Sequence, residues 1–240
     1  MIPQEIGDAA QNGDRDRAIA WLNAGGSIDD ADVEGYTLVN CCACGDIDSE
    51  VVNDRHVALA RHLIALGADV NIASRAAPMH QIVQRTWGRQ AILEMLSLLL
   101  GAGANVNARD GYGHTPLWYA IRHDPEHSLT LITKLLRAGA LLDACNGRES
   151  AEDILQRRES QWAPLAGHEH WKRLRALVAG VRKHGTYKRY IRAPHRDVLA
   201  VRGLAQRGKL STNDPVLHFL ARLGDNGVVW NVLSFWRATN

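Results

Sequence analysis

The chain has 240 residues, of which 46% are hydrophobic and 22% charged, and its formal net charge is +2. No segment approaches the roughly 20 apolar residues of a membrane helix, and the amino terminus lacks the basic-then-apolar order of a secretion signal. The four cysteines, three of them at Cys41, Cys42 and Cys44, do not resemble a disulfide framework. We therefore expect a cytoplasmic protein without membrane contact, and a nuclear location stays open.

Charge is unevenly distributed along the sequence. Residues 1–171 hold 14 Lys and Arg against 23 Asp and Glu, a net charge of −9, whereas residues 172–209 hold 12 against one, a net charge of +11. Basic segments of this kind bind nucleic acid, lie against acidic parts of the same chain or are simply solvated. The sequence leaves these three explanations open.

Four similar glycine-containing segments divide the first part of the chain. They occupy residues 25–29, 67–71, 103–107 and 139–143, so successive copies are 42, 36 and 36 residues apart. A run of apolar residues with helical spacing precedes each of them, at residues 18–23, 58–66, 92–100 and 129–137. A repeat of this length predicts stacked helical units that bury their apolar faces against one another.

Residues 110–143 show the unit most clearly. A glycine-rich turn at 110–113 precedes Thr115 and Pro116, which suit the start of a short helix because threonine can cap and proline fits the first helical position. A second helix is expected at about 129–137, and Gly139 follows it as a terminator. Each unit should therefore contain a turn, a short helix and a longer helix.

These motifs resemble the ankyrin repeat. The resemblance rests on Thr115-Pro116-Leu117 and on residues 98–110, LLLGAGANVNARD, and it covers about residues 4–180. It implies an all-α solenoid of about five helix-turn-helix units that binds other proteins. The first repeat, 6–30, and the fifth, from 147, would be the terminal caps, because both lack part of the pattern. The second, 32–71, carries an insertion at 46–54.

The predicted organisation has three parts. Residues 1–183 form the ankyrin repeat domain, 184–196 a basic connector, and 197–240 a small helical C-terminal region. In the fifth repeat, Ser150 and Asp153 are placed to form a capping box, and an apolar stripe beginning at Trp171 forms the second helix after a loop at 161–169. Helices are expected at 197–206 and from Asp214, before an apolar segment at 223–236.

The resemblance places a protein-binding surface on the turns and first helices. Its variable contact positions fall on Val33, Glu34, Tyr36, Ser74, Ala76, Gln84, Arg85, Tyr112, His114, Arg122, His123, Asn146 and Arg148. Tyrosine and arginine are the residue types that contribute most to protein interfaces. The alternative is that these side chains are merely solvated. Trp118 and His80 stand at the family's buried histidine position, so we expect structural roles for both.

Metal and catalytic motifs are weak. Cys41, Cys42 and Cys44 lack the spacing of a zinc site, and Cys42 takes a position that favours a small buried side chain. His168 and His170 have no nearby cysteine partner and are expected in a loop. The chain contains no G-x-S-x-G, H-E-x-x-H or phosphate-binding glycine motif. We therefore expect no enzyme, no metal and no cofactor.

The C-terminal segment LGDNGVVWNVLSFW resembles the start of an F-box, although Gly224 stands where that motif has proline. The resemblance implies docking to a ubiquitin-ligase adaptor through Val228, Val229, Val232, Leu233 and Trp236. The alternative is that the segment packs on the last repeat. We expect a non-catalytic adaptor or scaffold that binds a protein. A substrate receptor of a cullin-RING ubiquitin ligase is the first alternative, and a nucleic-acid-associated module using residues 172–209 is the second.

Overall fold

The computed structural model describes residues 1–49, 51–72, 76–85, 89–143, 146 and 148–207, except for some side chains near the end of the last range. In these ranges the chain forms eleven α-helices and one 3-10 helix, and its only β-type pairing is an isolated bridge between Ala31 and Thr37. The described part of the chain is therefore all-helical, as predicted. It divides into two compact units, Met1–Arg182 and Lys183–Asn240.

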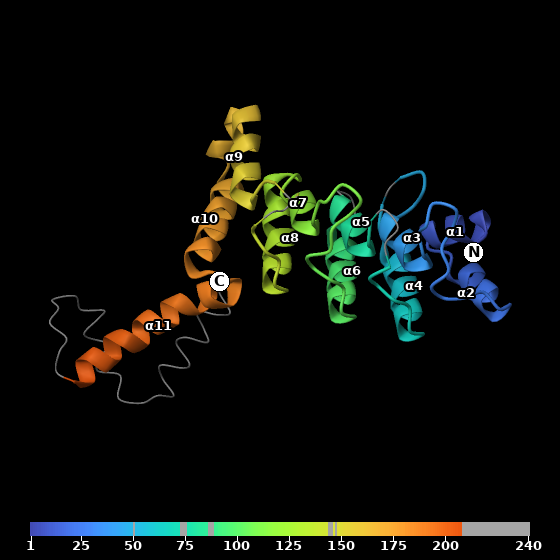
Figure 1. Cartoon of the computed structure of the whole chain (residues 1–240), viewed down its shortest axis with the longest axis horizontal. Helices are drawn as coiled ribbons and strands as arrows, with labels where there is room; N and C mark the ends of the chain where they lie inside the picture. Colours follow the sequence, from blue (N-terminus) through green and yellow to red (C-terminus); the bar gives the residue numbers. More distant parts are fainter. Residues whose placement is uncertain (50, 73–75, 86–88, 144–145, 147, 208–240) are drawn as a thin grey trace. The chain divides into compact units, whose positions relative to one another are not determined.

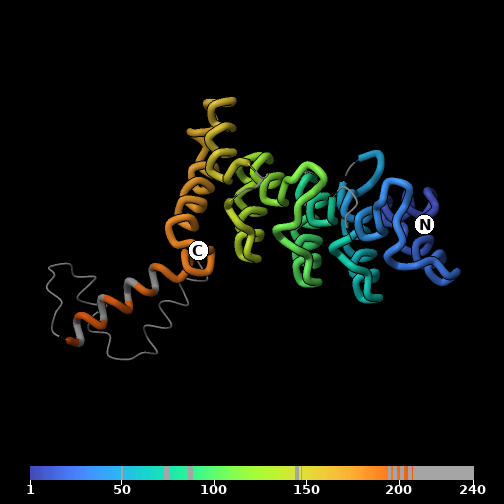
Figure 2. Tube along the Cα trace, viewed as in Figure 1, coloured from blue at the N-terminus to red at the C-terminus, as the bar shows by residue number. Residues whose placement is uncertain are grey.

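The first unit contains five successive helix pairs (Figure 1). Their bounds are α1 Gln4–Gln11 and α2 Arg15–Asn23; α3 Leu38–Cys44 and α4 Asp54–Ala65; α5 Pro78–Gln84 and α6 Arg89–Gly101; α7 Pro116–Ala120 and α8 Pro125–Arg137; and α9 Ala151–Gln161 and α10 Glu169–His184, with the 3-10 helix η1 Ala163–Gly167 between the last two. The first helices α1, α3, α5, α7 and α9 contact one another in order, and α4 contacts α6. The chain passes through the pairs in sequence (Figure 2).

Local sequence signals set most helix ends. The side chains of Asp14, Thr37, Asn53 and Asp124 accept hydrogen bonds from backbone N–H groups in the first turns of α2, α3, α4 and α8. Ser150 and Asp153 form the predicted capping box of α9. Because Asp124 caps α8 and Pro125 occupies its first position, that helix begins four residues before the predicted start at 129.

Glycine ends the second helix of the repeated unit. Gly67, Gly103 and Gly139 have φ values of 99°, 86° and 99°. A Cβ built at any of the three would meet no atom within 4 Å, so the backbone conformation and not crowding requires glycine there. The recurring glycines of the sequence therefore mark the same structural position in three pairs.

The apolar stripes of the second helices form the core of the first unit. Leu96 and Leu99 of α6 and Leu131 and Leu135 of α8 are fully buried. In α10, Trp171 is buried and its indole N–H donates to Glu159 at 2.7 Å. The stripe predicted in this helix is therefore buried, and burial of such side chains is the main source of stability in a stack of short helices.

Asparagine and aspartate side chains join successive pairs. Asn71 accepts a hydrogen bond from the Asn105 N–H at 2.7 Å and donates to the Gly103 carbonyl at 3.2 Å. Asn107 repeats this arrangement 36 residues later with the Leu141 N–H, at 2.9 Å, and the Gly139 carbonyl, at 3.2 Å. These bonds satisfy backbone groups at helix ends that have no partner within their own helix.

The described part of the second unit is one long helix, α11 (Tyr187–Gln206). Gly185, with a φ of 80°, follows α10, and the hydroxyl of Thr186 accepts from the Arg189 N–H at 3.2 Å. Most of the range predicted as a connector, 184–196, is therefore helical and continuous with the helix predicted from 197. The helices predicted beyond residue 207 lie outside the described residues. No helix among those described has both the length and the apolar content to cross a membrane.

Candidate functional site

The turn before α7 is organised by one buried carboxylate. Oδ1 of Asp110 accepts from the N–H groups of Tyr112 and His114, both at 2.9 Å, and the Asp110 N–H donates to the His114 carbonyl at 3.0 Å. Gly113 occupies the position that needs a positive φ, 80°. The turn therefore holds Tyr112 and His114 in fixed positions beside the first helix.

Two further turns are built in the same way. Asp32 accepts from the N–H groups of Glu34 and Tyr36 at 2.9 and 2.8 Å, and its own N–H donates to the Tyr36 carbonyl. Asn146 accepts from the Arg148 N–H at 3.0 Å. Since these turns precede α3, α7 and α9, and since the first helices contact one another in order, the three turns follow one side of the first unit.

An aromatic and cationic stack lies beside the turn at Asp110. The rings of His114 and Trp118 are stacked with centroids 3.7 Å apart and planes 5° apart. The guanidinium carbon of Arg122 lies 4.4 Å from the centroid of the Trp118 ring, which is a cation–π contact. Tyr112 stacks on His114 at 6.0 Å and is itself 81% exposed. A buried tryptophan thus supports an exposed tyrosine and an exposed arginine.

A hydrogen bond ties Tyr119 to the carboxylate that organises the turn. The Tyr119 hydroxyl donates to Oδ2 of Asp110 at 2.5 Å. Burial, together with the negative charge of Asp110, raises the pKa of Tyr119, so this hydroxyl stays protonated and remains a donor. No carboxylate among the described residues forms an ion pair with Arg122, so its charge is available to a ligand.

Most of the predicted contact residues reach the surface. Val33, Glu34, Gln84, Tyr112, Arg122 and Arg148 are exposed, and Tyr36, Arg85, His114 and Asn146 are half-buried. Val33, at 82%, is as exposed as Tyr112 because the two occupy the tips of equivalent turns. These ten side chains remain candidates for a binding surface.

Two predicted contact residues are buried and must be removed from the set. Ala76 is 7% exposed and lies just before α5, whose first residues are fully packed. His123 is 8% exposed, and its Nε2 hydrogen-bonds to the Val83 carbonyl of the preceding pair. Ser74, and the predicted ligase-docking residues Val228, Val229, Val232, Leu233 and Trp236, lie outside the described residues.

The expected structural roles of His80 and Trp118 are confirmed. Nε2 of His80 hydrogen-bonds to the carbonyls of Ala108 and His114, at 3.0 and 3.2 Å, and Trp118 is 7% exposed. The hydrogen bonds by which Asp32 and Asp110 organise their turns were not predicted from the sequence. The spacing Asp-x-x-Gly, which both turns share, is the signal that could have found them.

Two of the three described cysteines lie in the core, and Cys44 is half-buried. Cys41 and Cys42 are fully buried, which agrees with the small buried side chain expected at Cys42. Burial raises the pKa of the Cys44 thiol to about 11, so the thiol is protonated at neutral pH and is a poor metal ligand. No three His, Cys, Asp or Glu residues among those described are grouped as a metal site requires. His170 lies in α10, not in the expected loop, and His168 ends η1.

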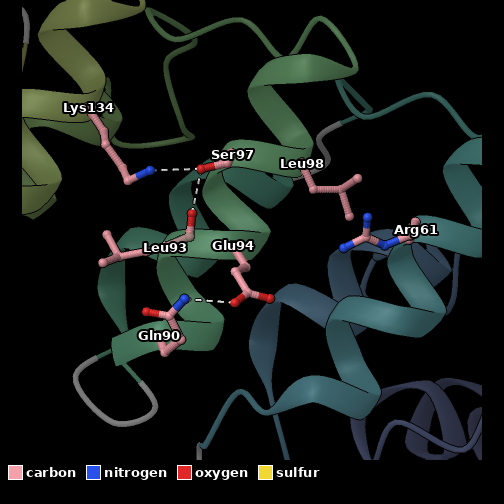
Figure 3. A pocket seen from close by; sticks show the side chains of 7 residues that line it. All are labelled: Arg61, Gln90, Leu93, Glu94, Ser97, Leu98 and Lys134. Atoms are coloured by element: carbon pink, nitrogen blue, oxygen red, sulfur yellow. Dashed lines mark hydrogen bonds between the residues drawn. The ribbon is translucent and has the colours of Figure 1, made fainter.

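A surface hollow of about 470 Å³ lies over the second helices (Figure 3). Its lining residues are Arg61, Gln90, Leu93, Glu94, Ser97, Leu98 and Lys134. The polar side chains bond to one another: Lys134 donates to Ser97 at 2.9 Å, and Gln90 donates to Glu94 at 2.7 Å. Because no buried polar atom here lacks a partner, the hollow does not demand a ligand, and the turn side is the stronger candidate.

No protein-family model matches the chain, and no curated protein matches it either. Its function must therefore be inferred from the chain itself.

Proposed function

We propose that residues 1–182 are an ankyrin-type repeat array that binds a protein partner, without catalysis, through the turns before its first helices. The exposed side chain of Tyr112, supported by the stack of His114, Trp118 and Arg122, carries the proposal. Tyrosine and arginine held by a rigid neighbour lose little conformational entropy on binding, which is why such residues dominate interface energetics.

The turn geometry supports the same proposal. Turns organised by Asp32, Asp110 and Asn146 precede α3, α7 and α9, which belong to one ordered series of contacting first helices and can present their turn residues to one partner. Val33 contributes an apolar contact at one end and Arg148 a cation at the other. A partner of complementary shape would meet a mixed surface with aromatic and cationic character at its centre.

The test uses matched pairs of substitutions in the full-length protein. We expect Tyr112→Ala with Arg122→Ala to lose a partner that the unaltered protein recovers from nuclease-treated cell extract, as identified by mass spectrometry. With the purified partner, each substitution should weaken binding roughly tenfold, measured by calorimetry. Circular dichroism should show unchanged helix content in both variants, because both side chains lie at the surface.

The control pair is Leu66→Ala with Arg61→Ala, which replaces one exposed apolar side chain and one exposed cation on or beside α4. It should recover the partner normally. The proposal is wrong if the control loses the partner as the turn variant does, or if the turn variant binds the purified partner with unchanged affinity.

An adaptor role in ubiquitin ligation is a second proposal, and it rests on the sequence LGDNGVVWNVLSFW alone. In this reading the repeats capture a substrate while residues 228–236 dock the ligase adaptor. Val232→Asp or Leu233→Asp should then abolish recovery of cullin and adaptor subunits and leave the substrate bound. Recovery of the same ligase subunits by these variants would exclude the docking role.

A further inference from the structure

Part of the basic segment 172–209 is neutralised within the first unit. Arg175 forms an ion pair with Glu159 at 2.8 Å, and Arg173 pairs with Glu169 at 3.2 Å. Arg182 pairs with both Glu152, at 2.8 Å, and Asp143, at 2.6 Å. These three arginines of α10 form ion pairs with acidic residues of the first unit. Their positive charge is therefore neutralised within that unit.

Among the described cations that form no ion pair, Lys172 and Lys183 lie on α10, and the others of this segment lie on and next to α11. Lys188, Arg189, Arg192 and Arg196 are exposed, and none forms an ion pair with a described carboxylate. At about 100° of rotation per residue, the four lie within roughly 100° of one another around the helix. Beyond them, the Arg207 guanidinium lies close to Gly203, 3.6 Å from the position that a Cβ would take there.

Gly203 falls by register in the same sector, so the Arg207 guanidinium lies on the same side of the helix as the four cations, beyond a gap that contains Leu199. From residue 188 to residue 203 this cationic stripe is about 22 Å long at 1.5 Å per residue. Within α11 the only acidic residue is Asp197. These positive charges have no acidic partners among the described residues. Contacts within the protein therefore do not explain why they are gathered on α11.

We propose that this stripe of α11, Lys188, Arg189, Arg192, Arg196 and Arg207, binds the phosphate backbone of nucleic acid. A duplex carries one negative charge per about 1.7 Å of its axis, so a stripe of this length meets several phosphates at once. Guanidinium groups match phosphate oxygens with two parallel hydrogen bonds, and four of the five cations are arginines. Contacts to the backbone alone make the binding independent of base sequence.

An anionic membrane surface would also attract these cations, but the described apolar side chains do not support it. A helix that lies in a membrane interface presents its large apolar residues on one face. The exposed large apolar residues of α11 are Ile191, Leu199 and Leu204. By register they lie about 80° and 140° apart, distributed around the helix. These three described side chains share no insertion face, since Leu199 falls by register among the cations, and the vesicle experiment below separates the two kinds of surface.

The experiment measures binding of the full-length protein to a fluorescent 20-base-pair duplex of mixed sequence by anisotropy, between 50 and 200 mM NaCl. We expect affinity to fall steeply with salt: five phosphate contacts would give a logarithmic slope of about −4.5 and a loss of a few hundredfold over this range. A second duplex of unrelated sequence should bind equally well.

The variant Lys188→Gln, Arg189→Gln, Arg192→Gln, Arg196→Gln should lose at least about tenfold in affinity at 50 mM NaCl, and its salt slope should become shallower by about 0.9 for each contact removed. The control Arg17→Gln, Arg55→Gln, Arg61→Gln, Lys172→Gln removes the same charge elsewhere and should bind as the unaltered protein does. Arg189→Lys with Arg192→Lys and Arg196→Lys keeps the charge and should retain the salt slope, which separates loss of charge from loss of the helix.

Absence of duplex binding at 50 mM NaCl would overturn the proposal, as would equal losses in the α11 variant and the control. Vesicles of phosphatidylserine and phosphatidylcholine serve as the competing surface. Sedimentation with these vesicles, without affinity for the duplex, would assign the stripe to a membrane and would also overturn the proposal. None of these outcomes bears on partner binding at Tyr112.

Discussion

Between residues 67 and 143 the helix pairs are joined by amide side chains, whereas the junction to the last pair, α9 and α10, uses arginines. Asn71 and Asn107 each bond to two backbone groups of the following pair. At the last junction, Arg158 donates from one nitrogen to the carbonyls of Ile121 and His123, at 2.5 and 2.7 Å, and Arg182 reaches Asp143.

The two kinds of junction respond to different conditions. Hydrogen bonds between neutral groups change little with ionic strength, whereas exposed ion pairs weaken as salt screens them. The repeated amides follow the repeated sequence, while the arginine contacts join residues 35 to 39 positions apart. The last pair thus attaches by side chains that no repeat specifies.

Mild acid should produce the largest difference between the two regions, because it destabilises the helix pairs that contain buried histidines. His56, His80, His123 and His127 are buried, and the first three hydrogen-bond to a backbone carbonyl of a neighbouring pair. Burial lowers the pKa of all four. The described residues of α9 and α10 contribute no such buried histidine.

The direction of this pH effect on stability follows from the protons that the folded and unfolded chains bind. Below pH 6.5 the unfolded chain binds protons at these histidines while the folded chain does not, so the free energy of unfolding falls as pH falls. The slope is up to roughly 1.4 kcal/mol per pH unit for each histidine, until the lowered folded-state pKa is reached. Urea unfolding at pH 7.5, 6.5 and 5.5 measures it. Replacing the exposed, non-titrating Gln90 with alanine should leave the slope unchanged, whereas His56→Gln should reduce it; an equal slope in both variants would contradict the prediction.

The amide junction is tested by Asn107→Ala. The substitution removes two hydrogen bonds, to the Gly139 carbonyl and from the Leu141 N–H. We expect the free energy of unfolding to fall by about 1–2 kcal/mol, to the same extent in 0.1 and 1 M NaCl. Gln90→Ala, which removes a bond within α6, should cost close to nothing. A cost for Asn107→Ala that disappears at high salt would show that the junction is not held as described.

The smallest effect is expected from Arg182→Gln, at the arginine junction. Its ion pairs with Glu152 and Asp143 are at the surface, so the cost should be at most about 1 kcal/mol at low salt and should disappear in 1 M NaCl. Arg61→Gln, whose side chain forms no ion pair among the described residues, should show no salt-dependent cost. Hydrogen exchange of α10 amides locates the effect. Equal protection in 0.1 and 1 M NaCl would contradict it.

The candidate binding surface was partly predictable. The ankyrin resemblance placed Tyr112 and Arg122 at contact positions, and both are exposed. It placed Ala76 and His123 there too, and both are buried; His123 hydrogen-bonds to the Val83 carbonyl of the preceding pair. A family pattern specifies a position in the repeat, while exposure depends on the side chains of the adjacent repeat, which differ from copy to copy.

The sequence alone determined what depends on a few consecutive residues: the helical period, the glycines with positive φ that follow the second helices, and the Ser150–Asp153 capping box. Only the tertiary structure decided which cations are neutralised and which are free, because Arg175 and Arg182 find carboxylates 16 to 39 residues away. It also joined the connector and the following helix into α11. Local spacing encodes helices and turns, whereas pairing over long distances depends on how the packed helices bring side chains together.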